Sequence, residues 1–145
     1  MKYLTIFFIL FTTVLAFGKT KEQIINDITN EATRQGFDPD LAVAIATVES
    51  GLNPNAIGLL KERGLFQLRP EYHKLNGETK NNIETGIKYL AQLKSKFEAK
   101  HGAGWFVLYN YGPYNAPKKP MNTAYFKKVT REINRIKVSR YLARN

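Results

Sequence analysis

The spacing of its apolar residues constrains the fold of this chain more than any other feature. Apolar residues recur every three to four positions in several segments, and nowhere do apolar and polar residues alternate with period two. The first pattern is typical of helices that bury one face, and the second of half-buried strands. No internal repeat is present either. The sequence therefore predicts an all-α fold, a compact bundle-like domain.

The residues between the apolar stretches predict where the helices begin and end. A first apolar face, from Ile24 to Ala32, is followed by Gly36, and a glycine here commonly ends a helix. Asp38-Pro39 then provides an N-cap and a proline at the first helical position. Residues 51–63 contain turn signals and are expected to form a loop. The expected helices are one ending before Gly36, residues 38–50, one from about Asn82, Trp105–Tyr109, and one from about Asn122 onward.

The first residues are not expected to belong to the folded domain. A basic residue, Lys2, precedes an apolar run over residues 3–14, and Ala16 and Gly18 place small residues where a signal peptidase reads. This order is typical of a secretory signal peptide. We therefore expect residues 1–18 to be a cleaved signal and residues 19–145 to form one domain that is exported to the periplasm or cell envelope. The alternative is an uncleaved N-terminal anchor, although a membrane span needs about 20 apolar residues.

The residue types present exclude several kinds of chemistry. The chain has no cysteine, so an exported domain must fold without disulfides, and thiol or redox catalysis is excluded. The only histidines, His73 and His101, lie far apart in the sequence, and neither has carboxylates at ligand spacing. We interpret both as surface residues, which leaves little material for a metal site or a Ser-His-Asp triad. We expect no metal and no cofactor.

Positive charge is concentrated near the C-terminus. The chain carries a formal net charge of +10, and residues 118–145 hold nine basic residues against the single acid Glu132, a net charge of +8. Such a segment attracts polyanions over a long range. In an exported protein, the expected partner of this segment is an anionic wall polymer or membrane surface. Nucleic acid is the alternative for a basic chain, and the signal segment argues against it.

One carboxylate, Glu49, follows closely on an apolar run at residues 41–46 and directly precedes Ser50 and Gly51. A glutamate here is either a surface charge just past a core helix or an acid held in a semi-apolar cleft. The cleft would disfavour the ionised form and raise the pKa, which suits a general acid at neutral pH. These residues alone leave both interpretations open.

Four blocks of the sequence resemble, in order, the motifs of the soluble lytic transglycosylase family, the relatives of goose-type lysozyme. They are Ala44–Ala56, which contains Glu49, then Gly64–Pro70, Asn82–Leu90 and Leu108–Pro113, with a weaker fifth match at Tyr125–Val129. Together the blocks span nearly the whole of the expected domain. The resemblance implies a compact lysozyme-like helical domain.

The resemblance also implies an activity: cleavage of the β-1,4 bond between N-acetylmuramic acid and N-acetylglucosamine in peptidoglycan. Family members use one glutamate and neither metal nor cofactor, and the matching residue is Glu49. It would protonate the leaving glycosidic oxygen and then, once ionised, accept the proton of the sugar's own 6-hydroxyl, which leaves a 1,6-anhydromuramoyl end. Ordinary glycosidases need two carboxylates, but an enzyme that uses the substrate's acetamido group can dispense with the second.

Three residues near Glu49 or in the second block are expected to contribute to substrate binding. Ser50 either hydrogen-bonds Glu49 or its surrounding backbone, or caps the helix. Gln67 matches a position that would bond the N-acetyl or hydroxyl groups of a sugar. Phe66 stands where methionine is commoner in the family, and its ring either stacks on a sugar or belongs to the core.

Three residues of the later blocks complete the predicted substrate site. Tyr109 and Asn110 are expected to line the cleft with hydrogen-bonding groups, although without the resemblance the aromatic residues from Trp105 to Tyr111 would be interpreted as core. Tyr125 resembles a family tyrosine whose hydroxyl points toward the catalytic acid. The residues before it depart from the family pattern.

The segment before Gly64 departs most from the family, which has a serine and small residues there. Residues 57–63 are bulkier and charged, and Gly58 stands near the place of a serine that helps to orient the substrate's acetamido group. Glu62 is either a second carboxylate of the cleft or a solvated charge beside Lys61 and Arg63. Tyr111, in place of alanine, would narrow the cleft.

The sequence thus supports a leading function and two alternatives. The leading one is an exported peptidoglycan lytic transglycosylase, and the small size resembles that of specialised enzymes that open local gaps for secretion systems, pili or infecting phage. The second keeps the fold but uses water, as a hydrolysing lysozyme-type muramidase. The third is a catalytically weak wall-binding or assembly module that acts through the basic C-terminal helix.

Overall fold

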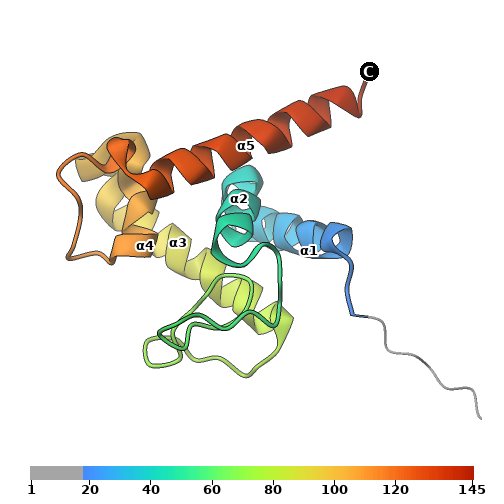
Figure 1. Cartoon of the computed structure of the whole chain (residues 1–145), viewed down its shortest axis with the longest axis horizontal. Coiled ribbons are helices and arrows are strands. Elements are labelled where there is room, and N and C mark those ends of the chain that lie inside the picture. Colours follow the sequence, from blue (N-terminus) through green and yellow to red (C-terminus); the bar gives the residue numbers. More distant parts are fainter. Residues whose placement is uncertain (1–17) are drawn as a thin grey trace, which may run out of the picture.

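The computed structural model describes residues 18–145, and Figure 1 shows their arrangement. The expected signal peptide, apart from Gly18, lies outside the described residues. The helical elements are α1 (Lys21–Arg34), α2 (Pro39–Ser50), α3 (Thr79–His101), η1 (Gly102–Val107), α4 (Leu108–Tyr111), η2 (Pro120–Asn122) and α5 (Ala124–Leu142). Within residues 18–145 there is no β-strand, only isolated bridges that join Arg63 to Ile57 and to Leu68. The predicted all-α fold is confirmed.

The first two helices begin where the sequence provides caps. Thr20 and Gln23 form a reciprocal capping box at the start of α1, in which each side chain accepts a hydrogen bond from the other residue's backbone N–H. The Asp38 side chain accepts the N–H groups of Asp40 and Leu41, directly before a proline at the first position of α2. Gly51 ends α2 in the left-handed conformation, with a φ of 62°. The predicted bounds of the second helix are therefore confirmed.

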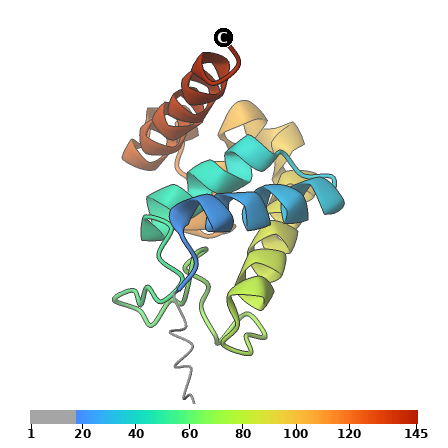
Figure 2. The ribbon, with the colours of Figure 1, turned by 90° about the vertical axis from the view of Figure 1, so that its right-hand side faces the viewer.

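Helix α2 is the centre of the domain. All six residues from Leu41 to Ala46 are buried, so this helix is apolar around its whole circumference. It packs against α1 and α5, and α1 lies beside it in both ribbon views (Figures 1 and 2). Ala42, Ala44 and Ala46 are fully buried, and their small side chains let the neighbouring helices come close. The core thus holds rigidly the helix that carries Glu49 at its C-terminal end.

Helix α3 supports the long loop that connects it to α2. Its buried face includes Asn82, Ile83, Gly86, Ile87 and Leu90. A methyl group on Gly86 would overlap the ring of Phe66, so this glycine lets the loop pack directly on the helix. Figure 1 shows the loop lying against the N-terminal half of α3.

The segment predicted as a single helix over Trp105–Tyr109 is instead divided between a 3₁₀ helix, η1, and one turn of α-helix, α4. Gly102 ends α3 with a φ of 54°, and the tighter helix that follows buries every residue from Gly104 to Leu108. A Cβ on Gly104 would lie 2.9 Å from Pro120 Cγ, so this turn packs against a distant part of the chain. The physical reason for the difference is that contact.

The C-terminal helix, α5, begins at Ala124, and the Thr123 side chain caps it by accepting the N–H of Phe126. Its inner face buries Tyr125 and Val129, and its last turns project beyond the other helices (Figure 1). Among the helices of residues 18–145, none is both long enough and apolar enough to cross a membrane.

Candidate active site

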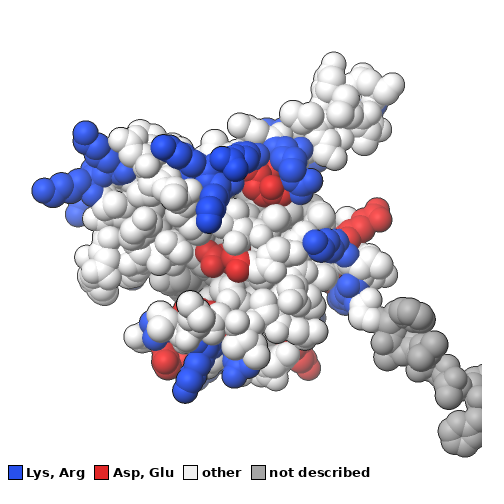
Figure 3. Space-filling model, viewed as in Figure 1, with Lys and Arg blue, Asp and Glu red and all other residues white. Residues whose placement is uncertain are grey.

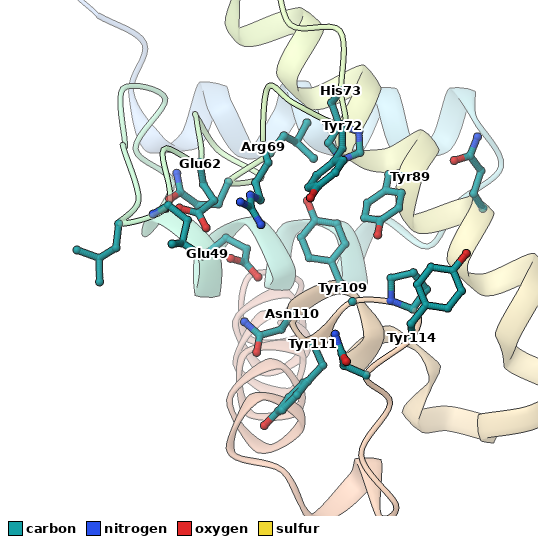
Figure 4. A pocket seen from close by; sticks show the side chains of 18 residues that line it. Glu49, Glu62, Arg69, Tyr72, His73, Tyr89, Tyr109, Asn110, Tyr111 and Tyr114 are labelled. Carbon is teal, nitrogen blue, oxygen red and sulfur yellow. Dashed lines mark hydrogen bonds between the residues drawn. The ribbon is translucent and has the colours of Figure 1, made fainter.

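A cleft of about 1000 Å³ opens between the end of α2, the loop that follows it, and the segment around α4 (Figure 4). This volume lies at the upper end of the range for ligand sites. Its lining residues are Glu49, Leu59, Leu60, Glu62, Gln67, Leu68, Arg69, Tyr72, His73, Tyr89, Gln92, Tyr109, Asn110, Tyr111, Gly112, Pro113, Tyr114 and Asn115. Four predicted site residues, Glu49, Gln67, Tyr109 and Asn110, are thus brought together.

Glu49 occupies the last turn of α2, and its half-buried side chain faces this cleft. Burial raises the pKa of the Glu49 carboxyl above its ordinary value, and the negative charge of Glu62 raises it further. A hydrogen bond from the Tyr125 hydroxyl to Glu49 Oε1, 2.7 Å long, favours the ionised form and opposes this rise in pKa. The arrangement suits a group that holds a proton yet can release it.

Tyr125 comes from the first turn of α5 and is 7% exposed, so it supports Glu49 from behind rather than lining the cleft. Burial and the charge of Glu49 raise the pKa of Tyr125 well above its ordinary value. The phenol therefore keeps its proton and acts as a hydrogen-bond donor. Its hydroxyl points toward Glu49, as the resemblance implied, but its predicted contact with the substrate requires correction, because Tyr125 does not line the cleft.

Tyr109 and Asn110 lie on α4 and reach the cleft differently. The Tyr109 hydroxyl donates a hydrogen bond to the Phe66 carbonyl oxygen at 2.6 Å, so it joins α4 to the loop. Its ring forms part of the cleft wall and contacts the ring of Tyr89, with centroids 5.5 Å apart. The exposed Asn110 side chain points into the cleft (Figure 4). Of these two residues, Asn110 is the one whose polar group is available to a ligand, because the Tyr109 hydroxyl already bonds the Phe66 carbonyl.

Gln67 sits at the strained tip of the loop, with a φ of 44°. Its Nε2 donates to the carbonyl oxygens of Gly64 and Ala56, at 2.9 and 3.3 Å. Those two bonds occupy the amide's donor side and fix its orientation. The acceptor Oε1 is the atom that remains for a bound molecule.

Two further predicted substrate-binding residues require correction, because Ser50 and Phe66 do not line the cleft either. Ser50 Oγ lies 2.9 Å from the Leu65 carbonyl oxygen and 3.0 Å from that of Ala46, so it ties the loop to α2 instead of bonding Glu49. Phe66 is fully buried against Gly86, which is the core position that the sequence left open as an alternative. Both residues support the site from within the fold.

Asn82 is a supporting residue that the sequence reasoning missed. It is the only buried polar residue among those described, at 6% exposure. Its Oδ1 accepts the N–H of Phe66 at 2.9 Å, and its Nδ2 donates to the carbonyl oxygen of Arg63 at 2.8 Å. A polar residue on the apolar face of α3 was the signal that could have identified it, because a buried amide needs partners.

The cleft wall also contains aromatic and basic residues that the sequence did not assign. Arg69 lies over the ring of Tyr72, 5.2 Å from its centroid. His73, interpreted from sequence as a surface residue, is half-buried in the cleft wall against Tyr89, with ring centroids 4.9 Å apart. Burial lowers the pKa of His73. Flat rings facing a cleft suit contacts with the apolar faces of sugars.

The part of the chain that the structure describes contains no group of three or more His, Cys, Asp or Glu side chains that could hold a metal ion.

Comparisons with known proteins assign the chain to a family. A search of curated proteins found no match. The family model described as "Transglycosylase SLT domain" matches residues 26–132, which include Glu49 and every element from α2 to η2 as well as most of α1. This match covers most of the chain. The chain therefore belongs to the transglycosylase SLT domain family.

Proposed function

We propose that this protein is a peptidoglycan lytic transglycosylase in which Glu49 is the single general acid and base. Membership of the SLT domain family supports a peptidoglycan-cleaving function of the lytic transglycosylase type in general. The proposal adds the catalytic residue, the 1,6-anhydromuramoyl product and the bond cleaved, between N-acetylmuramic acid and N-acetylglucosamine.

One observation carries the assignment of Glu49. It is a carboxyl group that faces a large open cleft, has a pKa raised by burial, and accepts a hydrogen bond from a buried tyrosine. Raised carboxyl pKa values in clefts are characteristic of general acids. The exposed Asn110 amide and the Gln67 Oε1 atom are the polar groups proposed to hold the sugars near it.

The proposed reaction proceeds in two steps. Protonated Glu49 donates its proton to the glycosidic oxygen as the C1–O bond breaks, and the carbonyl oxygen of the substrate's acetamido group bonds to C1. The ionised Glu49 then takes the proton of the sugar's 6-hydroxyl while that oxygen bonds to C1 and the acetamido oxygen leaves. The acid is restored, and no water is consumed.

Product analysis tests this proposal. The protein, incubated with purified peptidoglycan sacculi, should release anhydromuropeptides that mass spectrometry identifies, and Glu49→Gln should abolish their release. Glu98→Gln is the matched control, because Glu98 is an exposed glutamate of α3 outside the cleft. Products with reducing muramic acid ends would indicate a hydrolysing muramidase, and sacculus binding without any soluble product would indicate a wall-binding module. Activity that survives Glu49→Gln would contradict the assignment of Glu49 as the general acid and base.

The proposal extends to location and to a second contact. We propose that residues 1–18 direct export and that the basic side chains gathered along α5 (Figure 3) bind an anionic wall or membrane surface. Two of these arginines are engaged by acids, since Arg135 pairs with Glu132 at 2.6 Å and Arg140 with Asp40 at 2.7 Å. The remaining charges should make sacculus binding fall as salt rises. Binding that is insensitive to salt would argue against this contact.

A further inference from the structure

The loop that departs most from the family pattern is folded into a tight turn at the edge of the cleft. Gly58 N donates to the Glu62 carbonyl oxygen at 2.9 Å, and Lys61 N donates to the Gly58 carbonyl oxygen at 3.1 Å. Lys61 adopts a φ of 66°, a conformation that favours glycine. The turn therefore brings Glu62 back beside Gly58, and both ends are held by the bridges of Arg63 to Ile57 and Leu68.

Within this turn, the Glu62 carboxylate occupies the space that a side chain at position 58 would need. A Cβ on Gly58 would overlap Glu62 Oε2 and would lie 2.8 Å from Gln67 Oε1. The φ of Gly58 is not in the left-handed region, so its backbone does not require a glycine. A side chain at this position would instead displace the Glu62 carboxylate from its place. The Leu60 N–H donates to the same Oε2 at 2.9 Å and fixes its position.

Two acceptor oxygens, Glu62 Oε2 and Gln67 Oε1, thus both lie beside Gly58, and both belong to residues that line the cleft. Within residues 18–145, Glu62 forms no ion pair. Its Oε2 accepts the Leu60 N–H, and a carboxylate oxygen can accept a second hydrogen bond. Figure 4 shows Glu62 and Glu49 on the same side of the cleft, and the charge of Glu62 raises the pKa of Glu49. A group that binds between them must bring a hydrogen-bond donor. The substrate's acetamido group has one, its N–H.

We propose that the Glu62 carboxylate accepts a hydrogen bond from the acetamido N–H of the N-acetylmuramic acid residue whose glycosidic bond breaks. This inference rests on the proposed function, because it assigns Glu62 a part in the same reaction. Gly58 is the residue that makes room for it.

The bond would aid the first step without changing its products. As the glycosidic C1–O bond breaks and Glu49 gives its proton to the departing oxygen, the acetamido carbonyl oxygen bonds to C1, and positive charge spreads to the acetamido nitrogen. A carboxylate beside that N–H both orients the group and neutralises the charge that develops. Glu62 keeps its own protonation state throughout. In the second step the 6-hydroxyl displaces the acetamido oxygen and gives its proton to Glu49.

Kinetics of two independent variants test the contact. Glu62→Ala removes the acceptor, and Gly58→Ala keeps Glu62 but displaces its carboxylate by steric overlap. Each should lower kcat/KM for sacculus-derived glycan by about 10- to 100-fold, the range for one charge-assisted hydrogen bond. Glu62→Gln, with a neutral acceptor, should fall between Glu62→Ala and the wild type. The double variant should lose less activity than the product of the two single effects, because both changes remove the Glu62 contact. Any loss beyond that of Glu62→Ala would come from the new methyl group, which would lie 2.8 Å from Gln67 Oε1.

The control is again Glu98→Gln, which should stay within about twofold of the wild type because a surface substitution has little effect. Circular dichroism and thermal unfolding show whether each variant is folded. If Glu62→Ala fails to fold, Gly58→Ala still tests the proposal, because a non-glycine residue fits the backbone at position 58.

A binding measurement tests the contact without turnover. In the Glu49→Gln protein, calorimetry would compare a glycan tetrasaccharide with the same compound after removal of its N-acetyl groups, with and without Glu62→Ala. After removal of the N-acetyl groups, the sugars carry ammonium groups, which a carboxylate attracts. The preference for the de-N-acetylated compound, measured as the ratio of the two affinities, should therefore be about 10-fold higher with Glu62 present than in the protein that also carries Glu62→Ala. An unchanged ratio of the two affinities would overturn the proposal.

The outcomes separate the two hypotheses. The proposed function fails if the wild type releases no anhydromuropeptides or if Glu49→Gln remains active. The proposed role of Glu62 fails by itself if the wild type is active, Glu49→Gln is inactive, and both Glu62→Ala and Gly58→Ala keep kcat/KM within about twofold of the wild-type value. Reducing muramic acid ends that disappear in Glu62→Ala would also overturn it, because Glu62 would then activate water.

Discussion

Replacing Asn82 should weaken the attachment of the cleft loop to α3 more than any other single polar substitution. The Asn82 side chain accepts from Phe66 N at 2.9 Å and donates to the Arg63 carbonyl at 2.8 Å. Asn82→Ala leaves the Phe66 N–H without a partner, which costs about 1–3 kcal/mol. The Arg63 carbonyl oxygen loses one of its two bonds but still accepts the Leu68 N–H at 3.0 Å, so this loss costs only about 0.5–1.5 kcal/mol. Its amide also packs against Gly64, so a water molecule entering the vacated space can restore part of the bonding. We therefore expect the free energy of unfolding to fall by about 3 kcal/mol.

Thermal and denaturant unfolding measure this loss directly. For a chain of this size, a loss of about 3 kcal/mol lowers Tm by about 10 °C. Asn134→Ala, on the exposed face of α5, is the matched control and should change the free energy by less than about 0.5 kcal/mol. Well below the unfolding temperature, Asn82→Ala should also reduce kcat/KM, because the loop carries Glu62 and Gln67. A loss of under about 1 kcal/mol would refute the reasoning that these two bonds anchor the loop.

Three further substitutions test the site and its support. Tyr125→Phe removes the hydrogen bond that lowers the pKa of Glu49, so the pKa of Glu49 should rise. The high-pH limb of the kcat/KM profile should therefore move to higher pH, and a limb that does not move would contradict this. Glu49→Gln should raise the stability of the fold. Burial raises the pKa of Glu49 in the folded protein above the ordinary value of 4.5, so the wild type loses stability as the pH rises from 4.5 through the folded pKa. The variant has no carboxyl group at this position and does not lose this stability. The difference in Tm should therefore grow with pH, and a constant difference would be evidence against the buried, unfavourable charge. Gly86→Ala should lower the free energy of unfolding by about 1–3 kcal/mol, because the new methyl group overlaps the Phe66 ring. This overlap should outweigh the higher helix propensity of alanine. A higher Tm would show that the ring can move aside.

The parts of the fold that could be predicted are those that depend on neighbouring residues. The Asp38-Pro39 start and Gly51 end of α2 are local signals, and the structure confirms them. The division of the Trp105–Tyr109 segment could not be predicted, because its residues are buried on all sides and fit more than one helical pitch. The deciding contact, between Gly104 and Pro120, joins residues far apart in the sequence.

The candidate site divides in the same way. The position of Glu49 at the end of an apolar helix follows from the sequence, and the motif order indicates which other residues gather near it. The roles of Ser50 and Phe66 could not be predicted, because they depend on the path of the loop backbone: Ser50 reaches the Leu65 carbonyl, and the Phe66 ring turns toward Gly86. A sequence motif identifies which residues gather near the cleft. It does not identify which of their side chains line the cleft and which are buried and hold the loop in place.

In the proposed mechanism, the hydrogen bond between Tyr125 and Glu49 would let one carboxyl group serve two opposite steps. Tyr125 holds its proton firmly, because burial and the charge of Glu49 raise its pKa, so it donates to Oε1 whether Glu49 is protonated or ionised. In the acid form, a proton on Oε2 leaves Oε1 as the carbonyl oxygen, which is the better acceptor for the Tyr125 hydroxyl, so this arrangement is favoured. Once that proton has been transferred, the bond from Tyr125 becomes charge-assisted and stronger. If Glu49 acts as proposed, the tyrosine would favour the proton position needed in the first step and would stabilise the base needed in the second. This stabilisation would grow along the reaction.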